Sequence, residues 1–370
     1  MSTPIFVTRP SLPPLEELIP LLREIWDRRV LTNNGPFHQA FERAIADYLG
    51  VNHLSVAANG TLALSLAIDA AELEGEVITT PYSFVATAHA SVIGQLEPVF
   101  VDIRPDDLNI DPAAIEAAIT LRTSAILGVH CYGNPCDVYS IERIAQRHGL
   151  KVIYDAAHAF GVRYRGRGIL LWGDFATLSF HATKVFNTFE GGAVISSSAQ
   201  GKARVDRLRN FGIVDEVSVE LISGNAKMSE FNAALGLLQL DHFEQVRAAR
   251  GRVDARYRAL FADIAGIECL AIPADVEPNF SYFPILIGLD YPLSRDGLYE
   301  RLKQHDIFSR RYFYPLLSNL PMYAGLESAA ASNLPVATAA AAQILCLPIY
   351  PELGEDDQRR IVEVIADAAS

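Results

Sequence analysis

Two neighbouring stretches decide the predicted fold: KVIYDAAHAFGV at residues 151–162 and GDFATLSFHATKVFNTFEGGAVIS at residues 173–196. The first is a short apolar run that ends in Asp155, the pattern of a buried strand that delivers a carboxylate into a cleft. The second predicts a strand at 175–180, a polar loop that carries Lys184, a tight Glu-Gly-Gly turn and a strand that runs back. An aspartate at a strand end and a lysine on a nearby loop are therefore expected in the same part of the fold.

This pair of residues allows two interpretations. A lysine amine can bond the aldehyde of pyridoxal phosphate (PLP), while an aspartate pairs with the ring nitrogen and keeps the ring an electron sink. A buried strand aspartate in a salt bridge and an unrelated surface lysine would have the same spacing. The spacing of Asp155 and Lys184 by itself leaves both interpretations open.

The chain before this stretch alternates predicted helices and strands. Such alternation indicates an α/β layered domain with a mostly parallel sheet, in which ligands bind at the carboxyl ends of the strands. Gly60, Phe84 and Asp155 each follow a predicted strand, so we expect them to converge at one edge of the sheet. Helices are predicted at 15–26, 37–49 and 141–148, and strands at 53–58, 77–78, 98–102 and 125–129.

A strand–glycine–helix junction lies at Asn59, Gly60 and Thr61. The free amides and the positive dipole end of the helix suit a phosphate, although most such junctions are ordinary helix caps. No Gly-x-Gly-x-x-Gly or P-loop pattern accompanies the predicted strands, which disfavours a dinucleotide or ATP enzyme.

Taken together, these motifs resemble the DegT/DnrJ/EryC1/StrS family of sugar aminotransferases. DAAHAFG, SFHATK and FEGG are similar to the family pattern Asp-x-x-(His/Gln), Ser-Phe-x-x-x-Lys and Gly-(Glu)-Gly-Gly, and the resemblance covers most of the chain. It implies a PLP fold-type I architecture, like that of aspartate aminotransferase, with a mostly parallel sheet in the large domain. The large PLP-binding domain would comprise residues 1–245, including an N-terminal helical segment, and a smaller α/β C-terminal domain residues 246–370.

The resemblance also implies roles for individual residues. Lys184 would anchor PLP and then move a proton as general base and acid, while Asp155 would keep the ring nitrogen protonated. Phe84 would stack on the ring and His158 would contact the cofactor or its 3-hydroxyl, whereas a core phenylalanine and a core histidine are the simpler alternatives. The remaining cofactor contacts implied are Gly60, Thr61 and Ser179 to the phosphate, and Asn225 to the phosphate of the neighbouring subunit.

The Asn225 assignment implies a homodimer with shared active sites. The family segment reads Gly-x-Asn-x-Arg-Met-x-Glu, whereas here Gly224 directly adjoins Asn225 and Lys227 replaces the arginine. A turn that enters the long helix predicted from Phe231 is the structural alternative.

Substrate contacts are expected from two places. SRRYFYPL at 309–316 corresponds to a family segment that often reads Thr-Arg-x-x-Tyr-x-Pro-Leu, which makes Arg310, Arg311 and Tyr314 candidates for the substrate diphosphate or the donor carboxylate. His181 lies close to Lys184 in sequence and is a further candidate. A solvated surface loop is the alternative for either arginine.

Composition narrows the classes of partner. The net charge of −13, without a basic stripe, disfavours nucleic-acid binding. The four cysteines are too scattered for a disulfide framework or a metal site, so no metal is expected. The sequence shows neither the pattern of a signal peptide nor an uninterrupted apolar span, and these features predict a cytoplasmic protein without membrane contact.

The predicted function is PLP-dependent transfer of an amino group from L-glutamate to a nucleotide-linked keto-sugar. The sequences of the motifs resemble those of enzymes that act on dTDP-linked keto-6-deoxyhexoses. The predicted substrate is dTDP-4-keto-6-deoxy-D-glucose, and a dTDP-3-keto-6-deoxyhexose is the alternative. The product would be an amino sugar for O-antigen, another surface polysaccharide or a secondary metabolite. Lys184 argues against a PLP-dependent sugar dehydratase, which has a histidine there, and against a PLP-binding regulator that has lost the lysine.

Overall fold

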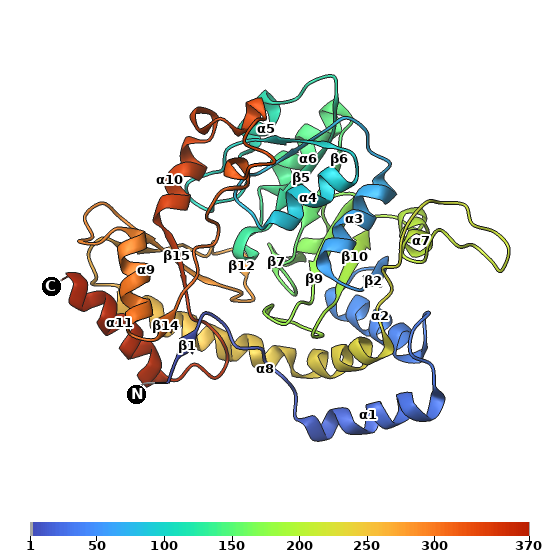
Figure 1. Ribbon diagram of the computed structural model, residues 1–370, viewed down its shortest axis with the longest axis horizontal. Coiled ribbons are helices and arrows are strands. Elements are labelled where there is room, and N and C mark those ends of the chain that lie inside the picture. Colours follow the sequence, from blue (N-terminus) through green and yellow to red (C-terminus); the bar gives the residue numbers. More distant parts are fainter. Residues whose placement is uncertain (1–2, 370) are drawn as a thin grey trace.

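The computed structural model describes residues 3–369 and is built around a seven-stranded sheet (Figure 1). The strand order is β2-β10-β9-β6-β5-β3-β4, and all neighbouring strands are parallel except β10, which is antiparallel to both β2 and β9. The predicted α/β architecture with a mostly parallel sheet is thereby confirmed. The strands are β2 (Leu54–Ala57), β3 (Glu76–Thr79), β4 (Glu97–Phe100), β5 (Thr123–Val129), β6 (Lys151–Asp155), β9 (Phe175–Ser179) and β10 (Gly192–Ser196).

Helices cover both faces of this sheet, and alternate side chains of β6 pack into the cores on the two faces. Val152 and Tyr154 pack into the core formed with α2, α6 and α8, whereas Ile153 packs into the core formed with α3 and α7. Because successive side chains of a strand point to opposite faces, a strand buried on both faces reads as one apolar run. These helices are α2 (Pro36–Leu49), α3 (Gly60–Ala71), α4 (Val85–Ile93), α6 (Val138–His148), α7 (Ala199–Leu208) and α8 (Glu230–Phe261), with α1 (Leu15–Arg28) lying along α8 and α5 (Pro112–Ala117) near α6.

The C-terminal part has its own antiparallel sheet and its own core. The sheet order is β11-β13-β15, and the core includes residues of α9, α11 and the C-terminal half of α8. Strand β1 pairs with β14, so the N-terminal segment is hydrogen-bonded to this part of the fold. The elements are β1 (Ile5–Phe6), β11 (Ile267–Cys269), β13 (Phe283–Ile287), β14 (Ile307–Phe308), β15 (Ile344–Leu347), α9 (Arg295–Gln304), α10 (Pro335–Gln343) and α11 (Glu355–Ala369), and a small sheet of β7 (Arg163–Tyr164), β8 (Arg167–Gly168) and β12 (Val276–Glu277) bridges the two parts.

Helix α8 differs from the sequence-based expectation. The sequence pattern predicts separate helices at 231–250 and 253–261, but one continuous helix of 32 residues spans both (Figure 1). Its N-terminal half packs under the large sheet, and Val253, Tyr257 and Phe261 belong to the C-terminal core. The predicted domain boundary after residue 245 lies inside this helix, and the division into 1–245 and 246–370 stays a prediction.

Glu230, at the start of α8, ties two helices together. Its side chain is 1% exposed and accepts hydrogen bonds from the backbone amides of Phe37 (2.9 Å) and His38 (2.8 Å) in the first turn of α2. These amides have no acceptor within their own helix, and the carboxylate also lies at the positive dipole end of α2.

We expect Glu230→Ala to lower the free energy of unfolding by about 3 kcal/mol, because two buried amides lose a charged acceptor. Glu16, exposed in the first turn of α1, offers a matched control: Glu16→Ala should change stability by no more than about 0.5 kcal/mol. Thermal denaturation of both variants tests this, and an equal small effect would contradict it.

Among residues 3–369, the structure contains no helix whose length and apolar character would allow it to cross a bilayer.

Candidate active site

A cavity of about 710 Å³ lies at the carboxyl edge of the large sheet. Asp155 ends β6, Ser179 ends β9, and Lys184 follows on the loop after β9; all three line this cavity. Gly60, the first residue of α3, and Phe84, which directly precedes α4, line it too. The structure thus brings together the residues that were expected to converge.

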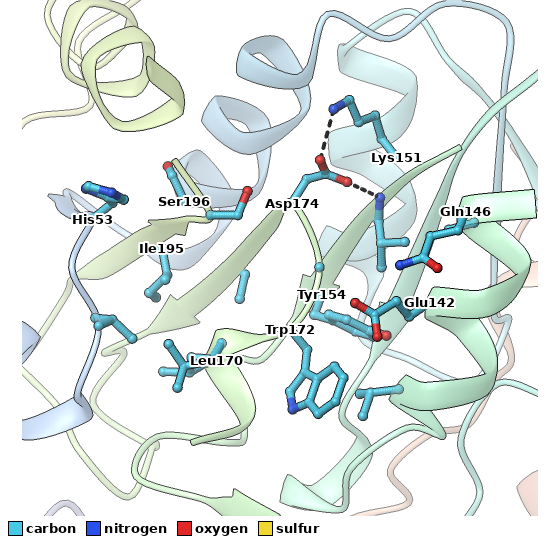
Figure 2. Close-up of a pocket in the computed structure, with 18 of the residues that line it drawn as sticks. His53, Glu142, Gln146, Lys151, Tyr154, Leu170, Trp172, Asp174, Ile195 and Ser196 are labelled. Atoms are coloured by element: carbon cyan, nitrogen blue, oxygen red, sulfur yellow. Dashed lines mark hydrogen bonds and ion pairs between the residues drawn. The ribbon is translucent and has the colours of Figure 1, made fainter. Parts of the chain in front are cut away.

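A second cavity of similar volume lies at the opposite edge of the sheet, where β6 begins (Figure 2). Its lysine, Lys151, forms an ion pair of 2.9 Å with Asp174, whose other oxygen accepts the backbone amide of Val152 at 2.9 Å. Because each of these charged groups already has a partner, this cavity presents no free lysine–carboxylate pair. Asp155 and Lys184, the residues predicted to carry the chemistry, line the first cavity and not this one.

Asp155 is 6% exposed and both of its carboxylate oxygens accept hydrogen bonds. Oδ1 accepts the backbone amide of Ala157 at 3.1 Å, and Oδ2 accepts the hydroxyl of Thr87 at 2.8 Å. Burial raises the pKa of Asp155, while these two hydrogen bonds and the Lys184 charge act in the opposite direction. A protonated ring nitrogen placed against this carboxylate would offset the cost of burying the charge.

Lys184 faces the same cavity. Burial lowers the pKa of its amine from 10.5 to about 8, and the nearby Asp155 carboxylate limits the shift. A lysine with a pKa of about 8 has far more free amine at neutral pH than an ordinary lysine, and a nucleophile and proton carrier requires free amine.

The lowered pKa predicts how Lys184 reacts with amine reagents. In the cofactor-free protein, the fraction of unprotonated amine rises as pH increases through 8, so acetylation of Lys184 should reach half its maximal rate near pH 8. In the urea-denatured chain the midpoint should move up to about 10.4, the value of an ordinary lysine. Mass spectrometry of the Lys184 peptide measures both profiles, and coincident profiles would contradict this prediction.

The loop after β2 fits a phosphate. The first amides of a helix have no acceptor within the helix. In α3 the Asn59 side chain accepts the amide of Leu62 at 2.9 Å, and the amides of Gly60 and Thr61 stay available for a ligand. A Cβ on Gly60 would lie 2.6 Å from the Cβ of Ser179, so only glycine allows the Ser179 hydroxyl to approach this helix end. The amides and the hydroxyl suit an anionic group at the end of the cavity.

Phe84 and His158 both line the cavity, and their predicted contacts with the cofactor stay predictions. Phe84 is 59% exposed and lines the cavity, so it is not a core phenylalanine. His158 is buried, with its ring parallel to that of Phe313 (centroids 5.9 Å apart). Its Nδ1 accepts the backbone amide of Tyr132 at 3.3 Å, and burial holds the pKa of the imidazole well below its usual range. The ring is therefore neutral and carries its proton on Nε2.

The predicted substrate residues divide into two groups. His181 lines the cavity and its ring nitrogen lies 2.8 Å from the Thr183 hydroxyl. Arg310 lines an adjoining cavity of about 250 Å³ that shares Thr183, Tyr282 and Tyr312 with the first. Arg310 has no carboxylate partner among the described residues, and its guanidinium interacts with the Tyr312 side chain. Arg311 instead pairs with Asp296 at 2.9 Å.

Tyr314 also lies outside both cavities. Its ring packs under the guanidinium groups of Arg295 (4.4 Å) and Arg311 (5.3 Å). The structure of the single chain thus places Arg311 and Tyr314 in a surface cluster, away from the residues around Lys184.

Asn225 lies apart from the cavity of its own chain. It is exposed, its Oδ1 accepts the amide of Lys227 at 3.2 Å, and Lys227 reaches the side chain of Asn210 at 2.7 Å. Its predicted contact with the cofactor of a neighbouring subunit stays a prediction.

Several residues of the cavity were not predicted from the sequence. Tyr282, Tyr312 and Phe313 come from the C-terminal part and close one side of the cavity. Tyr312 and Phe313 lie within the 309–316 segment, but no signal in the sequence indicates which of its aromatic residues faces inward. Thr87, which bonds Asp155, was not singled out by any sequence pattern.

The residues present fit PLP. A buried carboxylate suits the ring nitrogen, an exposed aromatic ring suits a flat cofactor, a lysine with a lowered pKa suits the aldehyde, and the Gly60 junction suits the phosphate. No group of three or more potential metal ligands occurs within residues 3–369.

Comparisons with known proteins point in the same direction. A sequence model of the DegT/DnrJ/EryC1/StrS aminotransferase family matches residues 15–366. The chain is 52% identical to a dTDP-4-amino-4,6-dideoxy-D-glucose transaminase of Shigella dysenteriae, over 99% of this chain and 100% of that protein, and 51% identical to one of Escherichia coli, over 97% of each. It is also similar to a crystal structure of DesI in the presence of its TDP-sugar product (TM-score 0.95, 38% identity, covering 100% of this chain and 94% of that one).

Proposed function

The chain belongs to the DegT/DnrJ/EryC1/StrS aminotransferase family, and from this premise we propose that it aminates carbon 4 of dTDP-4-keto-6-deoxy-D-glucose with L-glutamate as donor. The observation that carries the proposal is that Lys184 and Asp155 line the same cavity at the carboxyl edge of the sheet. Two relatives above 50% identity that span nearly the whole chain have names that specify the 4-amino-4,6-dideoxy sugar, which supports carbon 4. A cytoplasmic location belongs to the proposal as well.

Each residue would hold one part of the cofactor. Gly60, Thr61 and Ser179 would bind the phosphate, Phe84 would cover one ring face, and Asp155 would pair with the ring nitrogen. The proton on His158 Nε2 would be donated to the ring hydroxyl, because Nδ1 already accepts the amide of Tyr132. When bound, PLP supplies the aldehyde that carries the amino group and an electron-withdrawing ring.

Lys184 then carries out the proton transfers. With a pKa of about 8, its free amine can take the proton from the α-carbon of L-glutamate and later deliver a proton to carbon 4 of the sugar. Asp155, held by two hydrogen bonds, would stabilise positive charge on the ring nitrogen throughout. Tyr282, Tyr312 and Phe313 would limit the access of water to these atoms.

Arg310 is the proposed contact for an anionic group of the substrates. It lies beside Tyr312 in the cavity that adjoins the Lys184 cavity and has no carboxylate partner among the described residues, so its guanidinium can still bind a carboxylate or diphosphate.

The test follows the nitrogen atom. Purified protein is incubated with PLP and L-glutamate labelled with a heavy nitrogen isotope, together with dTDP-4-keto-6-deoxy-D-glucose in one reaction and a dTDP-3-keto-6-deoxyhexose in a parallel reaction. Both products are examined by NMR. We expect the labelled nitrogen to be bonded to carbon 4. A product labelled at carbon 3, formed only from a dTDP-3-keto-6-deoxyhexose, would favour the alternative substrate, and no labelled sugar from either would contradict the proposal.

We also propose that the protein acts as a homodimer in which Asn225 completes the partner's site. The loop that follows α7 projects from the large sheet (Figure 1), and Val217 and Ile222 on it are fully or almost fully exposed. Exposed apolar side chains beside an exposed asparagine suit a protein–protein interface.

Mixing two inactive variants tests the shared site. Lys184→Ala and Asn225→Ala chains, unfolded together and refolded, should regain activity, because each mixed dimer then contains one site with both residues intact. A mixture of Lys184→Ala and Asp155→Asn is the control: both residues belong to the same chain's site, so its mixed dimers have no intact site. Recovery in neither mixture would contradict the shared arrangement.

A further inference from the structure

A chain of hydroxyl groups leads to Asp155 from helix α4. The Thr87 side chain, which is fully buried, bonds Asp155 Oδ2 at 2.8 Å, and the Ser83 hydroxyl lies 2.8 Å from the Thr87 hydroxyl. Ser83 is 4% exposed and lines the cavity. The two residues connect the cavity wall to the carboxylate through the protein interior.

The direction of these hydrogen bonds follows from the number of protons. An ionised carboxylate can only accept, so the single hydroxyl proton of Thr87 is donated to Asp155. The Thr87 oxygen must then accept from Ser83, which fixes the order Ser83 to Thr87 to Asp155. With Oδ1 bonded to the Ala157 amide, both oxygens are held and the carboxylate has one orientation.

The hydrogen-bond partner of Thr87 differs from the usual partner of a hydroxyl group in a helix. Ser or Thr side chains inside helices often bond the carbonyl one turn earlier. Ser91 on the same helix does this, with its hydroxyl 3.2 Å from the carbonyl of Thr87. The Thr87 hydroxyl instead bonds Asp155 at the end of β6. Phe84, which lines the cavity, directly precedes the same turn of α4.

We propose that Thr87, supported by Ser83, is a positioning residue that holds Asp155 ionised and oriented toward the ring nitrogen of the cofactor. This inference rests on the proposed function. The start of α4 then contributes twice to the site, because Phe84 covers the ring face and the Thr87 hydroxyl holds the group that pairs with the ring nitrogen.

Apart from Lys184, the titratable groups considered around Asp155 are neutral or bonded elsewhere. Lys184 is the charged group that faces Asp155 within the described chain. Burial keeps the imidazoles of His158 and His130 neutral by holding each pKa below its usual range, and His89 on α4 bonds Tyr323 instead.

The test measures PLP binding by the full-length chain after its cofactor has been removed, followed by absorbance across a range of pH. Thr87→Val removes the hydroxyl and keeps the shape, so we expect roughly tenfold weaker binding at neutral pH. The defect should grow as pH falls, because Asp155 takes up a proton more easily without the Thr87 donor. Thr87→Ser restores the hydroxyl and should recover most of the affinity, and Ser83→Ala should have a smaller effect than Thr87→Val.

Thr79→Val is the matched control. Thr79 is equally buried and its hydroxyl donates to the carbonyl of Leu127 at 2.8 Å, so the variant loses a buried hydrogen bond that does not involve Asp155. Wild-type affinity and pH dependence in Thr87→Val, or equal losses in Thr87→Val and Thr79→Val, would overturn the proposal while leaving the aminotransferase function intact. Failure of the wild-type chain to bind PLP would instead overturn the proposed function.

Discussion

Replacing Lys184 by alanine is expected to reduce aminotransferase turnover by about 10⁴-fold or more, the largest effect of any single substitution in the chain. The variant loses both the amine that would anchor the cofactor and the group that would move protons between donor and acceptor carbons. PLP should still bind through Gly60 and Asp155, but without a covalent bond to the protein. Formation of 2-oxoglutarate from L-glutamate measures the loss, and mass spectrometry after borohydride reduction shows whether PLP is attached to the chain.

Lys151→Ala is the control for this variant. Lys151 lies at the start of β6, at the opposite edge of the sheet from Lys184, in an exposed ion pair with Asp174. Its removal should leave turnover close to that of the wild type. Appreciable turnover in Lys184→Ala, or covalent PLP on a different lysine, would show that Lys184 does not have the proposed role.

Asp155→Asn is expected to lower turnover by roughly 10²–10³-fold, the scale associated with the loss of one preorganised electrostatic group. Asparagine has the same shape but no charge, so it cannot stabilise a protonated ring nitrogen. The NH₂ group of asparagine would also take the place of one carboxylate oxygen. Either the Ala157 amide or the Thr87 hydroxyl would then face a donor instead of an acceptor. When PLP is supplied in saturating amounts, most of the loss should fall on kcat, because Asp155 acts on the ring nitrogen and not on the binding of substrate.

Asp254→Asn separates this effect from a general cost of altering a buried aspartate. Asp254 is 4% exposed and pairs with Arg258 at 2.7 Å in α8, away from the cavity. The control variant should lose stability but keep its turnover when folded. Equal turnover losses in both variants would contradict the special role of Asp155.

The sequence predicted the parts of the site that depend on local pattern. An apolar run with a polar last residue indicated β6 and placed Asp155 at its end, and the junction at Gly60 indicated a helix start with free amides. The parallel sheet then brought these loops together without further information, because the carboxyl ends of parallel strands share one edge.

Features that depend on long-range packing could not be predicted from the sequence. Whether Tyr312 or Tyr314 faces the cavity depends on how the C-terminal part packs against Tyr82 and Tyr132, whose positions are separated from it by roughly half of the chain. Thr87 gave no signal because its partner is 68 positions away. The continuity of α8 was hidden by polar residues where the helix passes from one core to the other.

The most direct test of the proposed function is the absorption spectrum of the purified protein with PLP, recorded in the near-ultraviolet and visible range before and after addition of L-glutamate. We predict a visible band from cofactor attached to Lys184, its loss when L-glutamate donates its amino group, and its return when dTDP-4-keto-6-deoxy-D-glucose accepts that group. A protein that shows no such band even with added PLP, or a band unchanged by L-glutamate, would contradict the proposed aminotransferase function.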